Sequence, residues 1–200
     1  MCYKLSQEEI KMVLEIINTI AIIAASGVAI YGINAWRKEF QGKRKIELAE
    51  EVLVLFYEAK DAVRAIRNPV GYSGEVSTRN HLNEPLVVRA FYERYEKRQE
   101  VFNKLYSKRY QFMARFGSDK TKPFKDLKEI MDDMYIAART LVRISEYHGN
   151  DRDKNVKDEI RKNELCILSS DADDPIATRM DKVISDIEAI CKPIILGKSN

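Results

Sequence analysis

Residues 16–36 read IINTIAIIAASGVAIYGINAW, a run of 21 positions without a charged side chain. As an α-helix rising about 1.5 Å per residue, this run is roughly 32 Å long, which matches the hydrocarbon thickness of a lipid bilayer. Glu15 precedes the run and Arg37 follows it. The core helix of a soluble protein seldom needs so long an uncharged run, so the sequence predicts a transmembrane helix here.

The residues before this run argue against a cleaved signal peptide. A signal peptide begins with basic residues, has a shorter apolar core and ends at a small-residue cleavage site. Here Glu8, Glu9 and Glu15 accompany Lys4 and Lys11 in the leader. We therefore expect a retained single-pass anchor.

Basic residues gather immediately after the predicted span, in a juxtamembrane segment covering residues 37–45. The positive-inside rule then places the rest of the chain in the cytosol and residues 1–15 outside, as a short extracytoplasmic tail of a protein in the cell inner (plasma) membrane. An aromatic side chain also suits the membrane–water boundary, and basic side chains suit anionic headgroups. The predicted membrane interface consists of Trp36, Arg37, Lys38, Lys43, Arg44 and Lys45.

Small residues recur along one face of the predicted span. Ala21, Ala25 and Ala29 are four residues apart, and Gly32 follows on roughly the same face. Such spacing lets two membrane helices approach closely, so it predicts self-association. Alanine is also common in membrane helices generally, and the pattern alone leaves both interpretations open.

The rest of the chain predicts an all-α fold, in which the transmembrane helix is followed by an antiparallel helical bundle over residues 46–197. Apolar residues recur at steps of three and four, with no convincing strand alternation. Pro69 ends the first helix, and Asp174 with Pro175 provides an N-cap and a first helical residue for the last one. The expected helices cover about residues 43–68, 86–116 and 123–148, and a last helix begins at Asp174 and has an apolar edge that runs to Ile194. The charged stretch 150–163 predicts at most a short, weakly specified helix.

The helix expected over residues 86–116 has a heptad-like, coiled-coil spacing of apolar residues, in which Arg98 and Arg109 share the register. We expect these two arginines to reach water or to pair with carboxylates. The helix is also rich in basic residues, which makes contact with a protein partner, nucleic acid or acidic lipid conceivable. Its candidate binding residues are Arg89, Arg94, Lys97, Lys104 and Lys108.

A competing interpretation is that these basic side chains pair with acidic neighbours. The candidates are Asp132, Asp133, Asp181, Asp186 and Glu188. The chain as a whole has 34 basic and 31 acidic residues, which argues against a dedicated nucleic-acid binder. The long loop expected over residues 68–85 is either functional or merely mobile.

No motif for catalysis, metal binding or a cofactor occurs. Asp151, Asp153 and Asn155 imitate the start of a calcium loop, but Val156 and Lys162 stand where glycine and glutamate are required. The cysteines at positions 2, 166 and 191 lack zinc-ligand spacing, and the last two are expected to be buried, reduced thiols. We therefore expect a non-enzymatic protein without cofactor or metal.

Four short segments resemble a type of small bacterial protein with one membrane helix and a helical cytosolic region. They are Trp36-Arg-Lys-Glu39, Gly42-Lys-Arg-Lys-Ile-Glu-Leu-Ala-Glu50, Phe56-Tyr-Glu-Ala59 and Ile66-Arg-Asn-Pro69. The likeness covers about residues 15–70. It implies the membrane topology and a bacterial origin, but no active site.

The sequence thus favours a membrane-anchored helical scaffold or regulatory protein that binds a protein partner, or a second copy of itself, at the cytosolic face. One alternative is a self-associating membrane effector that perturbs the bilayer. Another is a binder of nucleic acid or acidic lipid that uses the basic helix.

Overall fold

The computed structural model describes residues 7–70, 84–148, 153–169 and 174–198, and these contain helices and no strand. The helices are α1 (Gln7–Ile66), α3 (Leu86–Glu96), α4 (Gln99–Phe116), the short 3-10 helix η1 (Ser118–Thr121), α5 (Lys122–His148), α6 (Lys154–Ile167) and α7 (Pro175–Ile195). The chain divides into two compact units between Lys45 and Ile46. The predicted all-α class is confirmed.

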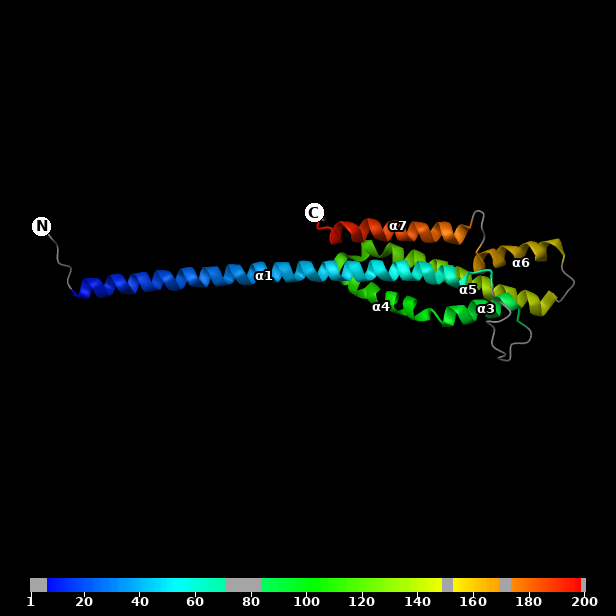
Figure 1. Ribbon diagram of the computed structural model, residues 1–200, viewed down its shortest axis with the longest axis horizontal. Helices are drawn as coiled ribbons and strands as arrows, with labels where there is room; N and C mark the ends of the chain where they lie inside the picture. The colour runs from blue at the N-terminus through cyan, green and yellow to red at the C-terminus, as the bar shows by residue number, and fades with distance from the viewer. Residues whose placement is uncertain (1–6, 71–83, 149–152, 170–173, 199–200) are drawn as a thin grey trace. The chain divides into compact units, whose positions relative to one another are not determined.

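The unit that begins at Ile46 is an antiparallel bundle. In Figure 1, residues 46–66 of α1 run in the same direction as α5, whereas α4 and α7 run the opposite way. Three phenylalanines from different helices meet in its core: the ring of Phe124 on α5 lies 4.9 Å from Phe56 on α1 and 5.4 Å from Phe112 on α4. All three side chains are buried. The apolar spacing predicted for these helices therefore does form one shared core.

The predicted recurrence of apolar residues at steps of three and four is confirmed for most positions of α5 and α7, whereas Ile190 and Ile194 near the end of α7 are only partly buried. Each buried side chain contributes to the hydrophobic stabilisation of the bundle. The buried positions are Leu127, Ile130, Met134, Ala137, Leu141 and Ile144 on α5, and Ile176, Met180, Val183 and Ile187 on α7.

Gly117 makes the tight connection between α4 and η1. Its φ of 96° lies in the region that L side chains rarely adopt, and its N–H donates to the carbonyl of Met113 at 2.9 Å. A Cβ at this position would lie 2.6 Å from the carboxylate of Asp119. Glycine thus lets α4 end and α5 start back along the bundle.

The prediction of a single helix over residues 86–116 is wrong, because the helix is interrupted between Glu96 and Gln99. Arg98 has φ −119° and ψ 0°, and its N–H donates to the carbonyl of Tyr95 at 2.9 Å. An unbroken helix would carry Arg98 onto the apolar face of its heptad. The break instead leaves Arg98 half-buried, with its guanidinium donating to the carbonyl of Arg94 at 3.3 Å.

Helix α6 is longer and better specified than its charged sequence suggests. It has 14 residues and begins after Asp153, whose side chain accepts from the N–H of Val156 at 2.9 Å. This N-cap satisfies one of the backbone donors that a helix start leaves without an intrahelical partner.

The buried side chain of Arg67 holds three elements of the bundle together. It follows α1 directly and is only 2% exposed. Its Nε donates to the carbonyl of Cys166 at 3.0 Å, and its Nη2 donates to the carbonyls of Leu165 and Leu168 at 2.8 and 2.7 Å. Arg67 therefore satisfies carbonyl groups at the C-terminal end of α6, which lack partners within their own helix.

The same guanidinium also reaches the start of α7. Its Nη1 lies 2.8 Å from Oδ2 of Asp174, and both side chains are almost fully buried. The other carboxylate oxygen of Asp174 accepts from the N–H groups of Ile176 and Ala177 at 3.0 Å each, which confirms the predicted N-cap. One ion pair thus caps the end of α6 and the start of α7, and ties both to the end of α1.

We predict that Arg67→Ala lowers the free energy of unfolding by about 3–5 kcal/mol, because Asp174 is left as a buried charge without its guanidinium partner. Arg67→Lys keeps the charge but not the planar fork of donors, so we expect a smaller loss. Denaturant titration of the full chain in detergent, followed by helical circular dichroism, measures both. Arg64→Ala, an exposed position three residues earlier on α1, is the control and should stay within about 0.5 kcal/mol. If Arg67→Ala and Arg64→Ala unfold at the same denaturant concentration, Arg67 does not stabilise the bundle in this way.

Candidate functional site

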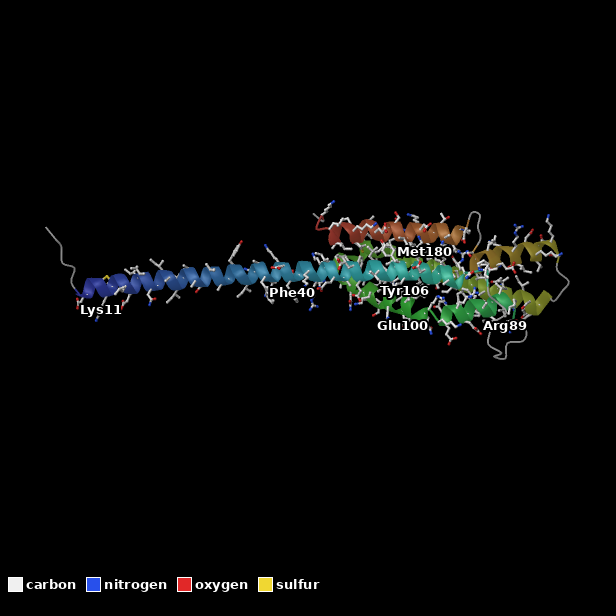
Figure 2. The ribbon with its side chains drawn as sticks, viewed as in Figure 1. Lys11, Phe40, Arg89, Glu100, Tyr106 and Met180 are labelled. Carbon is white, nitrogen blue, oxygen red and sulfur yellow. The ribbon has the colours of Figure 1, made fainter. Side chains whose placement is uncertain are left out.

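The N-terminal part of α1 exposes apolar side chains all around the helix. It contains a stretch long and apolar enough to cross a membrane, and none of that stretch is buried. Ile23 is 66% exposed, Val28 73% and Ile30 62%. Figure 2 shows the side chains of this part, between the labelled Lys11 and Phe40. A helix packed on a soluble core would instead bury one stripe, so the exposure fits a helix surrounded by lipid.

Two hydroxyl groups within this stretch, those of Thr19 and Ser26, are satisfied by their own helix. Oγ1 of Thr19 donates to the carbonyl of Glu15, and Oγ of Ser26 donates to the carbonyl of Ile22, each at 2.8 Å. Hydrocarbon offers no hydrogen-bond partner, so a polar group that enters it needs one within the protein. These two hydroxyls are therefore compatible with a lipid environment.

Aromatic and basic side chains meet at the C-terminal end of the stretch. The rings of Trp36 and Phe40 stack with centroids 5.6 Å apart, and the guanidinium carbon of Arg44 lies 5.0 Å from the centre of the Phe40 ring. Successive members are four residues apart, so they line one side of the helix. The predicted interface residues Arg37, Lys38, Lys43, Arg44 and Lys45 are all exposed, as is Trp36. This end therefore presents aromatic rings, among them the amphipathic indole of Trp36, together with positive charge, which is the composition of a membrane–water boundary.

The small residues predicted for self-association are exposed on one side of α1. Ala21, Ala25, Ala29 and Gly32 fall within an arc of roughly 80° at 100° per residue. A Cβ built at Gly32 meets no other atom within 4 Å. The face is open to a second helix, and self-association through it stays a prediction.

The basic residues of α3 and α4 do not form one continuous surface. Arg94 is buried and donates to the carbonyls of Asn68 and Val70, the second at 2.8 Å, so it is a structural residue rather than the surface residue predicted. Lys104 pairs with Glu100 at 2.8 Å and Lys108 with Glu51 at 2.7 Å. Arg89 is half-buried and Lys97 is exposed. Arg89 and Glu100 are labelled in Figure 2.

The carboxylates proposed as partners of this basic helix pair with other residues. Asp132 pairs with Lys128, Asp133 with Arg179, Asp181 with Lys60, Asp186 with Lys182, and Glu188 with Lys192. The expected pairing of α3 and α4 with these five acids is therefore wrong. Arg98 and Arg109 are half-buried, and neither forms an ion pair with a described residue.

The two described cysteines are free thiols, and Cys191 is buried as expected, whereas Cys166 is only half-buried. Burial raises the pKa of Cys191 to about 12 and also raises the pKa of the half-buried Cys166. Both thiols therefore stay protonated at neutral pH, which makes them poor nucleophiles. Within the described ranges, no group of three or more His, Cys, Asp or Glu residues is placed to hold a metal ion.

Three predicted features lie partly outside the described residues. The parts that are not described are residues 1–6 of the expected extracytoplasmic tail, residues 71–83 of the expected loop, and residues 149–152, which include the start of the calcium-like pattern at Asp151. Of that pattern, Asp153 acts as the N-cap of α6.

Sequence reasoning missed a groove on the outer face of α5, where Tyr92 of α3 also contributes. The groove has a volume of about 580 Å³. We call it the α5 groove, and its main lining residues are Tyr92, Ile136, Arg139, Thr140, Arg143 and Tyr147. A signal was present in the sequence, because the lysine–acid pairs spaced four apart early in α5 give way to Arg139 and Arg143, also four apart.

Comparison with models of protein families, with curated proteins and with solved structures finds no match to this chain. The resemblance of residues 15–70 to small bacterial membrane proteins therefore stays a prediction.

Proposed function

We propose that this chain is a non-enzymatic, membrane-anchored interaction protein. Residues 16–36 hold it in the cell inner (plasma) membrane, and the helical unit from Ile46 binds a protein partner or a second copy at the cytosolic face. The observation that carries the proposal is the apolar stretch of α1, none of which is covered by protein. A helix of this kind serves as an anchor, which implies that the attached unit acts at a membrane.

The charge around the stretch supports the cytosolic placement. Five basic residues follow it within the juxtamembrane segment 37–45, whereas Lys4 and Lys11 precede it. All five side chains are exposed, so they are available to the cytoplasmic leaflet with its anionic lipids.

The surface of the helical unit favours protein binding over nucleic-acid binding. Several of its lysines are neutralised by nearby carboxylates, as Lys108 is by Glu51 and Lys60 by Asp181. Exposed tyrosines such as Tyr110 and Tyr147 accompany them. Tyrosine is enriched at protein interfaces, whereas a nucleic-acid surface requires a concentrated basic patch.

The orientation is tested with a membrane-impermeant maleimide on intact cells. We expect Cys2 to be labelled from outside, since it lies before the span. A thiol introduced by Ser185→Cys, at an exposed position on α7, should react only after the cells are permeabilised. Labelling of this introduced thiol in intact cells, with Cys2 protected, would reverse the proposed orientation.

The interaction role is tested by extracting the tagged full chain from native membranes in a mild detergent, with a second copy carrying a different tag in the same cells. The control keeps residues 1–45 and replaces residues 46–200 by an unrelated helical bundle of similar size. We expect one protein partner, or the second copy, to be enriched at least about tenfold over the control. If both chains recover the same proteins in the same amounts, the interaction role is wrong.

A further inference from the structure

The outer face of α5 changes character halfway along the helix. In its first half, Lys122 pairs with Asp126, Lys125 with Glu129 and Lys128 with Asp132. These pairs at i and i+4 neutralise the solvated face. After Tyr135 the same face carries the α5 groove, and no such pair forms there among the described residues.

The two arginines of the groove lie one helical turn apart, and their guanidinium groups are not neutralised by an ion pair with a described residue. Neither Arg139 nor Arg143 forms an ion pair or a hydrogen bond with another described residue, although all three lysines in the first half of α5 are paired. Like charges at i and i+4 repel and destabilise a helix. An arrangement that is unfavourable in the free protein becomes favourable when carboxylates bind both guanidinium groups.

Apolar and aromatic side chains flank these arginines. Ile136 is 61% exposed and Tyr147 79% exposed. Tyr92 is half-buried, and its ring lies 5.6 Å from that of Tyr135 in an edge-to-face arrangement. Burial is the largest cause that raises the pKa of Tyr92, so its hydroxyl stays protonated and can donate a hydrogen bond. Tyrosine and arginine around an apolar centre is the composition of protein-interface hot spots.

The remaining lining residues limit the kind of ligand. Glu84 and Glu146 also line the groove, so a polyanion such as nucleic acid or polyphosphate would meet carboxylates beside the arginines. From Tyr135 to Tyr147 the face is about 18 Å long at 1.5 Å per residue. A small-molecule pocket encloses most of its ligand, whereas here the apolar side chains remain largely exposed. Length, exposure and mixed charge together favour a peptide segment with a few carboxylates.

We propose that the α5 groove binds an acidic segment of a protein partner, with its carboxylates on Arg139 and Arg143 and an apolar side chain against Ile136 and Tyr147. The geometry is that of an amphipathic segment laid along a helix face. This inference rests on the proposed interaction function and deepens it by naming the surface and the chemistry of the partner.

The test uses the full chain in lipid nanodiscs and a displayed library of random twelve-residue peptides. We expect the selected peptides to be enriched in Asp and Glu together with apolar residues. The variant Arg139→Glu/Arg143→Glu should select peptides enriched in Lys and Arg. By fluorescence anisotropy, the peptide that binds the wild type best should bind this variant about tenfold more weakly or worse.

The matched control is Lys157→Glu/Arg161→Glu, which changes the net charge equally at two exposed positions that are also four residues apart, on α6 and outside the groove. It should select the same acidic peptides as the wild type. Ile136→Ser should weaken binding severalfold and leave the acidic preference in place. All four positions that change charge are solvent-accessible, so we expect each variant to fold, and circular dichroism checks this.

Two outcomes would overturn the assignment of this groove. One is a wild-type selection without enrichment of acidic residues, and the other is an acidic selection that survives Arg139→Glu/Arg143→Glu. If a partner recovered by detergent extraction binds this variant and the wild type equally, the interaction function stands and the α5 groove is not its site. If no partner is recovered but acidic peptides still bind the groove, the α5 groove is an acidic-peptide site and the proposed interaction function is wrong.

Discussion

The apolar surface of α1 between Leu14 and Trp36 has to be removed from water, and no described part of the protein removes it. An isoleucine or valine side chain left in water forgoes roughly 1.5–3 kcal/mol of burial free energy. The stretch exposes isoleucine or valine at position after position around the helix. The bilayer location that we propose satisfies this constraint, because the helix already satisfies its own backbone and the hydroxyls of Thr19 and Ser26. The proposed function of the attached bundle rests on that location.

The bundle itself depends on a different interaction, a buried ion pair that joins helix ends. Arg67 and Asp174 lie far apart in the sequence, and together they satisfy backbone groups of α6 and α7 that have no intrahelical partners. A buried charge pair of this kind does not by itself guarantee high stability, but it penalises arrangements in which either partner is left alone. The pair therefore specifies how α1, α6 and α7 meet, while the Phe56, Phe112 and Phe124 core supplies the hydrophobic stabilisation.

Features set by neighbouring residues could be predicted from the sequence, and features set by distant contacts could not. The apolar stretch, the spacing of α5 and the cap at Asp174 are local patterns, and the structure has each of them. The break near Arg98 carries no proline or glycine to mark it. The role of Arg67 depends on carbonyls about a hundred residues away, and the burial of Arg94 depends on its contacts with the carbonyls of Asn68 and Val70, which lie 26 and 24 residues away. The sequence of α5 does carry a local signal of the groove, which is the change from lysine–acid pairs to two arginines.

The membrane location of α1 is tested most directly by the depth of its sole tryptophan, Trp36. The full chain is reconstituted in vesicles whose lipids carry bromine either near the headgroup or near the end of the acyl chain, and the tryptophan fluorescence is compared. Trp36 should be quenched more strongly by the shallow bromine, and Trp36→Phe/Val28→Trp, which moves the tryptophan to the middle of the stretch, should be quenched more strongly by the deep one. If neither bromine position quenches either protein, α1 does not enter the bilayer and the account fails.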